Sequence, residues 1–214
     1  CPTPAAFAEA HERFVRQRAE RLTHAEPRRL AEIVPLADLP RDRDAQAEPF
    51  ARQVLASATA LHAAHHDIDP VSGKRVSFGL VRMANIEPLV AVALALFRLG
   101  APAGLRIHLC VYHSQFPLLL RSGIEQRLDK ALNRRDPKAV FVLPEVRQPL
   151  DAHPEPDHLF IVLGSPVTEV GRDHDYDWAV VEPSSMRSLI QLAGRVRRHR
   201  PGLCSLPNLH VFSS

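Results

Sequence analysis

The segment HLFIVLGSPVTEVGRDHDYDWAVV, residues 158–181, decides the fold class of this chain. It contains two apolar runs, 158–163 and 177–181, with a polar loop between them. Each run is short and rich in aliphatic or aromatic residues, which is typical of strands that are buried on both faces. Strands of this kind belong to parallel sheets covered by helices, so the segment predicts an α/β domain.

The flanking sequence repeats the same alternation. We expect further strands at 75–82, 105–112 and 208–213, and helices at 86–99, 117–135 and 185–198. Residues 139–151 favour no long element, because Pro144 and Pro149 interrupt them. The pattern predicts a mostly parallel sheet between two layers of helices, with ligands at the carboxyl ends of the strands. The loops at those ends begin near Met83, His113, Gly164 and Glu182.

The first 70 residues have a different character. Residues 4–22 and 46–66 predict amphipathic helices, and residues 24–44 between them are rich in Pro, Asp and Arg and predict a connector. Residues 67–74 predict a loop. We therefore expect a helical inter-domain arm over residues 1–70 and an α/β domain over residues 71–214.

Composition excludes several classes of protein. With 214 residues, 45% hydrophobic and 24% charged, the chain can bury a core, and wholesale disorder is excluded. The longest apolar run, Leu89 to Phe97, is too short to span a membrane, which takes about 20 residues. The three cysteines (Cys1, Cys110 and Cys204) are far apart and odd in number, so we expect a reduced, cytoplasmic setting without a disulfide framework.

Arginine dominates the basic residues. Arg outnumbers Lys 24 to 3, and the positive excess lies in residues 71–214. A coding bias would explain this composition, and so would recognition of phosphate, for which the guanidinium group is preferred.

The densest cluster of arginines is QLAGRVRRHR, residues 191–200. On a helix Arg195 and Arg198 would share one face, and Gln191 would join them. Two adjacent guanidinium groups suit a triphosphate or a phosphoryl group that gains charge in a transition state. A solvated basic helix end, favourable against the helix dipole, is an equally good interpretation from spacing alone.

Several segments together resemble one family. The pattern Gln191-x-x-Gly194-Arg195-x-x-Arg198 resembles the sixth motif of superfamily 2 helicases, and residues 165–177 resemble the fifth. Residues 111–116 resemble the fourth motif, and residues 76–89 resemble the opening of the second RecA-like domain. The joined run looks most like the CRISPR-associated helicase–nuclease in its type I-F form, which is fused to an adaptation-protein domain. The resemblance covers residues 75–214.

The resemblance implies a three-layer αβα, RecA-like (P-loop NTPase-like) domain that forms one wall of an ATP site. Arg195 and Arg198 would then reach the γ-phosphate as arginine fingers and be the catalytic residues. Asp173 would accept hydrogen bonds from the ribose, Gly171 would leave room for the nucleotide, and Gln191 would complete this ATP-binding set.

The same resemblance implies contacts with single-stranded DNA. Asn85, Ser114 and Ser165 would bind its phosphates, and Arg82, His113 and Glu169 complete the implied DNA-binding set. Ser165-Pro166 stands where Thr-Gln is common in the family, so the hydroxyl is kept and the amide is lost. Asn85 and Ser114 also precede predicted helices, where helix capping is the alternative role.

The other wall of the ATP site is absent from this sequence. None of the three lysines (Lys74, Lys130 and Lys138) ends a P-loop, and no Asp-Glu pair is present to hold magnesium. The first RecA-like domain would therefore supply most ligands of ATP and magnesium. We also expect no metal site in this chain, since His62, His65 and His66 form only a weak ligand set.

The leading hypothesis is the second RecA-like half of an ATP-dependent single-stranded-DNA translocase, or helicase, that degrades invader DNA in CRISPR interference. By resemblance, its partners would be the first RecA-like domain, an HD nuclease domain with its own divalent metal, and a crRNA-guided surveillance complex. This chain alone is predicted to be inactive. The alternative is a non-catalytic α/β module that uses its arginine cluster to bind nucleic-acid phosphates.

Overall fold

The computed structural model describes residues 3–23, 27–36, 39–40, 42–169, 172–200 and 202–213. Within these residues seven strands form one sheet in the order β1-β7-β6-β3-β5-β4, and β2 pairs with β3 beside this path. The β2–β3 pair is antiparallel and the others are parallel. The strands are β1 (Ala31–Pro35), β2 (Asp67–Ile68), β3 (Arg75–Arg82), β4 (Leu105–Tyr112), β5 (Asp157–Gly164), β6 (Trp178–Val181) and β7 (Leu209–Ser213).

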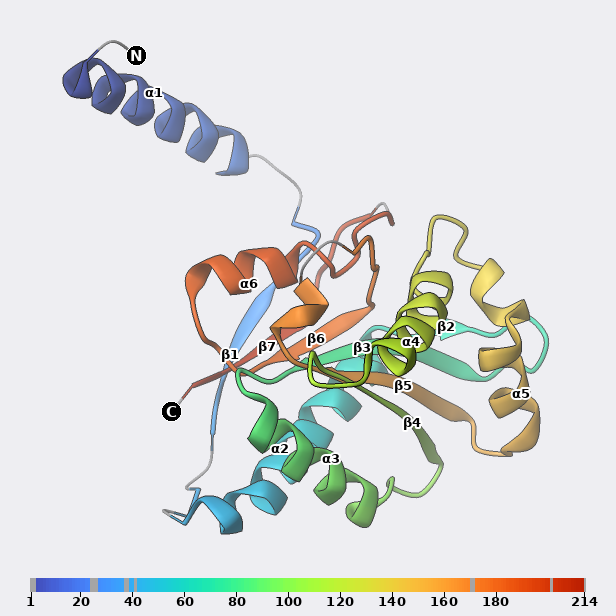
Figure 1. Cartoon of the computed structure of the whole chain (residues 1–214). Coiled ribbons are helices and arrows are strands. Elements are labelled where there is room, and N and C mark those ends of the chain that lie inside the picture. Colours follow the sequence, from blue (N-terminus) through green and yellow to red (C-terminus); the bar gives the residue numbers. More distant parts are fainter. Residues whose placement is uncertain are drawn as a thin grey trace.

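Helices cover both faces of the sheet (Figure 1). They are α1 (Pro4–Thr23), α2 (Arg43–Ala64), α3 (Ile86–Leu99), α4 (Leu118–Ala131), α5 (Pro144–Ala152) and α6 (Met186–Ala193), with 3₁₀ turns η1 (Ala139–Val142) and η2 (Pro166–Glu169). Residues of α2 and α3 build one hydrophobic core against the sheet, and residues of α4, α5 and α6 build a second core on its opposite face. The predicted three-layer αβα fold is confirmed.

Elements with strong local signals have the predicted bounds. Strands β3 and β4 and helix α3 begin and end at the predicted residues. Helix α3 places Leu89, Val92 and Leu96 on one face, as its helical spacing requires, and all three are buried. The helix ends at Gly100, whose φ of 68° lies in the left-handed region that glycine adopts at low cost.

The region before residue 70 differs from the prediction. The expected connector contains β1, which pairs in parallel with β7, and α2 contributes Val54, Ala58 and Leu61 to the first core. Strand β1 and helix α2 therefore belong to the sheet and its covering layer, and the predicted separate arm is wrong for these two elements. Only α1 stands apart from the body in Figure 1, and none of its residues is buried.

Helix α6 is shorter than predicted. It ends at Ala193, because the following residues form a parallel bridge between Tyr176 and Val196. Tyr176 N–H donates to the Arg195 carbonyl at 2.8 Å, and Arg197 N–H donates to the Tyr176 carbonyl at 2.9 Å. Arg195 and Arg198 therefore lie on a loop and not on one helical face. We call residues 195–200 the arginine loop.

No helix in the described part of the chain is long and apolar enough to cross a membrane.

Candidate nucleotide and nucleic-acid site

The loops that follow the parallel strands enclose one large groove of about 1120 Å³. Because parallel strands end at the same edge of a sheet, β3, β4, β5 and β6 bring their following loops together there. The polar residues that line the groove include Asn85, Ser114, Gln115, Ser165 and Glu182, and α2 and α3 supply apolar residues of the lining. The structure thus brings together three residues that were predicted to bind DNA phosphates.

The hydroxyl and amide groups of these residues are not used as helix caps. Asn85 occupies the N-cap position of α3, but its side chain makes no capping hydrogen bond. Ser114 is exposed and lies before Pro117, which occupies the N-cap position of α4. Ser165 is buried at the groove, and its carbonyl holds η2 by accepting a hydrogen bond from Thr168 N–H at 3.1 Å. The capping alternative for Asn85 and Ser114 is therefore wrong in this structure.

His113 lies beside the groove in a restrained position. It is buried, and its ring stacks on that of Phe116 with the centroids 4.0 Å apart. Its Nδ1 is buried and has no hydrogen-bond partner among the described residues. This side chain is held by its packing against Phe116.

Arg82 and Glu169 were predicted in the DNA-binding set, but the structure buries both. Only 1% of Arg82 is exposed, and its Nε donates to Glu169 at 2.7 Å. The other guanidinium nitrogens donate to the Glu182 carbonyl and to the hydroxyls of Ser184 and Ser188. Every nitrogen of the guanidinium group has a protein acceptor. The prediction that Arg82 contacts a DNA phosphate directly is therefore wrong for this conformation.

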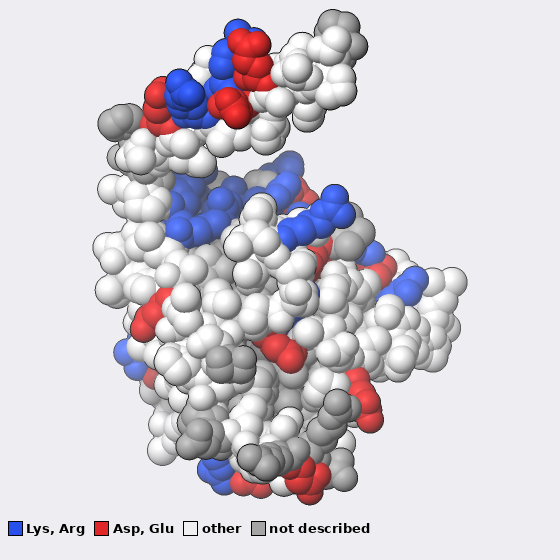
Figure 2. Space-filling model, turned by 90° about the vertical axis from the view of Figure 1, so that its left-hand side faces the viewer, with Lys and Arg blue, Asp and Glu red and all other residues white. Residues whose placement is uncertain are grey.

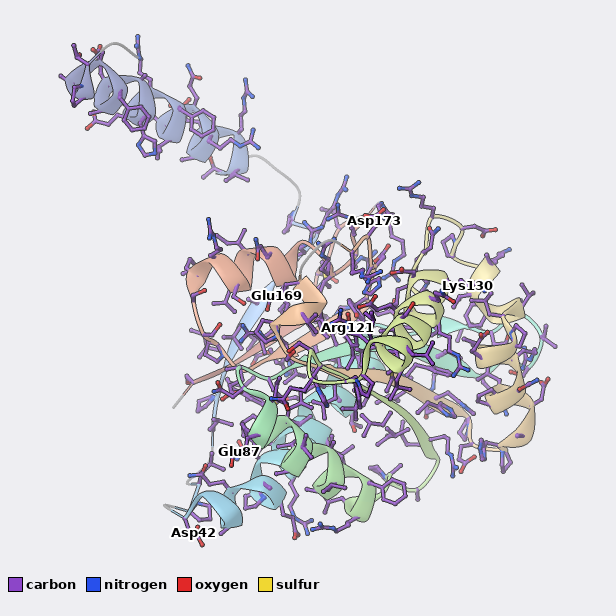
Figure 3. All side chains as sticks on the ribbon, in the orientation of Figure 1. Asp42, Glu87, Arg121, Lys130, Glu169 and Asp173 are labelled. Atoms are coloured by element: carbon purple, nitrogen blue, oxygen red, sulfur yellow. The ribbon has the colours of Figure 1, made fainter. Side chains whose placement is uncertain are left out.

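Glu169 connects the groove to the arginine loop. Its carboxylate accepts hydrogen bonds from Arg82 and Ser188, and its carbonyl accepts one from Arg195 at 3.0 Å. Figure 3 shows Glu169 within the body next to α6. Glu182, which anchors Arg82 through its carbonyl, also accepts from Ala84 N–H at 2.7 Å. Arg82 and Glu169 therefore position the loops around the site and do not themselves face the groove.

Two of the predicted nucleotide-binding residues, Asp173 and Arg198, lie together at the outer edge of the body. Arg198 Nε donates to Asp173 at 2.5 Å, and Arg135 and His199 also lie against this carboxylate. Burial raises the pKa of Asp173, but the hydrogen bond from Arg198 and the charges of His199 and Arg198 outweigh this and hold the pKa below its ordinary value. Asp173 is labelled at this edge in Figure 3. Gly171 lies outside the described residues, and Gln191 is exposed near the end of α6.

Arg195 is the more buried of the two predicted fingers. Its Nε is buried without a hydrogen-bond partner among the described residues, although one terminal nitrogen donates to Glu169. Burial, and then the charge of Arg198, lowers the pKa of Arg195. A buried donor without an acceptor is unfavourable, so an anion at this position would satisfy a group that the protein leaves unsatisfied.

Two buried carboxylates fix the shape of the arginine loop. Asp175 accepts from the backbone N–H groups of Arg198 and His199, and from the guanidinium group of Arg200. Asp177 pairs with Arg200 and accepts from Phe78 N–H at 2.6 Å. Burial would raise the pKa of Asp177, but the charges of Arg134 and Arg200 hold it below its ordinary value. These aspartates are structural.

Sequence reasoning missed two contributors to this site. Ser188 was within a predicted helix and Arg29 within a predicted connector, so neither had a local signal. Ser188 is buried against Glu169, and Arg29 donates from Nε to the Val196 carbonyl at 2.7 Å. Only the three-dimensional contacts show that both belong to the site.

Among the described residues no group of three or more His, Cys, Asp or Glu side chains could hold a metal ion.

The fold and the groove define a class of protein. Solved structures with the same fold include those described as T. fusca Cas3-ATP (TM-score 0.56, 19% identity) and T. fusca Cas3-AMPPNP (TM-score 0.55, 21% identity). Each alignment covers 88% of this chain and 18% of the other. This likeness confirms the RecA-like fold, with its parallel sheet and flanking helices.

The sequence identifies the family. The family model described as the C-terminal part of CRISPR-associated nuclease/helicase Cas3 matches residues 75–201, and the chain belongs to this family. A relative from Pseudomonas aeruginosa (strain UCBPP-PA14), named CRISPR-associated nuclease/helicase Cas3 subtype I-F/YPEST, is 52% identical over 209 residues. The protein of the same name from Pectobacterium atrosepticum is 48% identical over 211 residues. Each match covers 97% of this chain and 19% of the relative, and the resemblance to the type I-F form is confirmed.

Proposed function

We propose that this chain is the second RecA-like half of an ATP-dependent single-stranded-DNA translocase with a nuclease in the same protein, which degrades invader DNA. The proposal rests on two neighbouring features, the polar groove and the arginine loop. Glu169 connects them, because it accepts hydrogen bonds from Arg82 beside the groove and from Arg195 in the loop. The chain spans about a fifth of the length of the curated relatives that it matches, which leaves room there for a first RecA-like domain and an HD nuclease domain.

In this proposal ATP lies between two RecA-like domains, and this chain provides the far wall. Arg195 and Arg198 stabilise the charge that develops on the γ-phosphoryl group as it is transferred. Arg198 leaves Asp173 to do so, and Asp173 then accepts from the ribose hydroxyls, with Gln191 and Gly171 beside the nucleotide. The unsatisfied Nε of Arg195 supports a bound anion at this wall.

Magnesium does not fit the described residues at this wall. Its preferred oxygen ligands are scarce there, because Asp173 is already surrounded by Arg198, Arg135 and His199. We therefore assign the magnesium ligands to the first RecA-like domain and the nuclease metal to the HD domain.

Single-stranded DNA would lie in the groove. Ser114, Asn85 and Ser165 line it with hydroxyl and amide groups that bind phosphate oxygens without reading the bases. Sequence-independent contacts of this kind suit a motor that moves along any strand. The crRNA-guided surveillance complex would deliver the opened DNA strand to the intact protein in the cytoplasm.

The half-site can be tested directly with residues 1–214. We expect the purified chain to hydrolyse no ATP above background, with or without single-stranded DNA, because one wall of the site is missing. Adding the first RecA-like domain should restore DNA-stimulated turnover. Substantial ATP hydrolysis by residues 1–214 alone would contradict the half-site.

A second experiment separates the motor from a passive nucleic-acid-binding module. In the intact protein, a non-hydrolysable ATP analogue should change the affinity for single-stranded DNA, because closure of the two domains links the two ligands. A DNA affinity that is the same with ATP analogue, with ADP and without nucleotide would favour the passive module.

A further inference from the structure

The segment just before β1 lies against the arginine loop and is held there by a buried side chain. Asn208 is fully buried, and its Nδ2 donates to the Arg28 carbonyl while its Oδ1 accepts from Leu30 N–H, both at 3.0 Å. Cys204 N–H donates to the Pro27 carbonyl at 2.8 Å. The backbone on each side of Arg29 is therefore fixed by residues from the other end of the chain.

The side chain of Arg29 is also anchored. Its Nε donates to the carbonyl of Val196 at 2.7 Å. Val196 belongs to the arginine loop and is fully buried. In the described part of the chain, no hydrogen bond or ion pair to the terminal nitrogens of Arg29 is present. Since Nε takes the anchoring bond, these terminal nitrogens are the donors that a ligand could use.

The surroundings of Arg29 are unusually positive. Burial, followed by the charges of Arg28 and Arg198, lowers the pKa of Arg29, whereas the charge of Asp175 acts in the opposite direction. Asp175 is already bonded to Arg200 and to two backbone N–H groups. Figure 2 shows Lys and Arg side chains gathered on this face of the body, below α1. Like charges held close together are unfavourable unless an anion joins them.

We propose that Arg29 is a third phosphate-binding arginine of the nucleotide site, which contacts the γ-phosphate of ATP together with Arg195 and Arg198. This inference rests on the proposed function of the arginine loop. Arg29 comes from outside the segments that resemble helicase motifs, and its position is fixed by Asn208 and Val196 before any ligand binds. A preorganised guanidinium group loses little freedom when it binds a phosphate.

The test uses the full-length protein and three variants: Arg29→Ala, Arg29→Lys and Arg28→Ala. Arg28 is the matched control, because it is the neighbouring arginine and is exposed. We expect Arg29→Ala to lower kcat for DNA-stimulated ATP hydrolysis by about 10²-fold, the usual effect of losing one donor to a developing negative charge. Arg29→Lys should retain part of the activity, because it keeps the charge and loses the planar fork. Arg28→Ala should behave like the wild type.

Nucleotide binding identifies which phosphate Arg29 contacts. Arg29→Ala should weaken binding of a non-hydrolysable ATP analogue and leave ADP binding unchanged, because ADP has no γ-phosphate. Affinity for single-stranded DNA without nucleotide should also be unchanged. If DNA affinity falls while the analogue affinity and kcat stay at wild-type levels, the phosphate belongs to DNA and the inference is wrong.

Two further results would overturn the inference or separate it from the proposed function. Equal kcat values for Arg29→Ala and Arg28→Ala would remove Arg29 from the site. If Arg198→Ala also leaves ATP hydrolysis unchanged, the proposed function fails as well, whereas a loss confined to Arg198→Ala means that only the role of Arg29 is wrong. Should Arg29→Ala fail to fold, Arg29→Lys provides the same comparison, and wild-type kcat and analogue affinity in that folded variant would count against the inference.

Discussion

Arginines near the site fall into two groups that the structure treats differently. Arg82 is buried and the side chain of Arg200 is only 11% exposed, and each is paired with a buried carboxylate (Glu169 for Arg82, Asp175 and Asp177 for Arg200). Arg29, Arg195 and Arg198 hold backbone carbonyls or the exposed, shared carboxylate of Asp173. A buried charge with its own counter-charge maintains the fold, whereas a cation without one is available to a ligand.

The largest effect should come from the second group. Arg198→Ala in the full-length protein should lower DNA-stimulated ATP hydrolysis by about 10³–10⁵-fold, the range found for arginine fingers. The thermal stability of the protein should change little, because the Arg198 side chain is 39% exposed. Steady-state kinetics would measure the loss, and Arg187→Ala, an exposed arginine of α6, is the control. Wild-type turnover of Arg198→Ala would remove Arg198 from this role.

The first group should respond in stability. Arg82→Met leaves the carboxylate of Glu169 buried without its cation, and breaking a buried pair in this way costs about 3–5 kcal/mol. Urea unfolding of the purified chain would measure the difference in the free energy of unfolding. Arg52→Ala is the matched control, because it breaks the exposed Arg52–Glu48 pair at 2.6 Å, which is worth about 1 kcal/mol or less. An equal decrease in the free energy of unfolding for the two variants would show that the buried Arg82–Glu169 pair stabilises the fold no more than an exposed pair does.

We expect the smallest effect from a substitution in the groove, measured as a change in affinity for single-stranded DNA. Ser114→Ala removes one hydroxyl donor to a DNA phosphate and should weaken single-stranded-DNA binding by several-fold, since one hydrogen bond contributes about 0.5–1.5 kcal/mol. Folding should be unaffected, because Ser114 is exposed and caps no helix. Fluorescence anisotropy with the full-length protein would measure the affinity, with Ser205→Ala as an exposed control away from the groove. An affinity equal to that of the Ser205 variant would contradict the placement of DNA in this groove.

The parts of the fold that were predictable have local causes. Strands β5 and β6 contain the continuous apolar runs 159–163 and 178–181, and α3 combines a helical apolar face with a terminal glycine. Strand β1 was missed, because it is short, mostly exposed, and recognisable only by its pairing with β7. The end of α6 was missed because Val196 forms a β-bridge with Tyr176, and no residue near Val196 in the sequence indicates this contact.

The same distinction applies to the site. The topology predicted that the loops after the strands meet at one edge, and Asn85, Ser114 and Ser165, which the family resemblance had indicated, line one groove there. The burial of Arg82 could not be predicted, because its partner Glu169 is distant in sequence and reaches it from another loop. Whether an arginine is structural or available depends on such long-range partners.

Pairing of β1 with β7 also sets an order for assembly during synthesis. Ala31 pairs with Leu209, so β1, which comes first in chain order among the described strands, joins the sheet through β7, which comes last in that order. Among the described strands β1 pairs only with β7, so it has no partner there until β7 has been made, and closing so long a loop slows folding. The segment that carries Arg29 is aligned by Asn208 and therefore takes its place last. The arginine loop is completed only when the whole domain has been made.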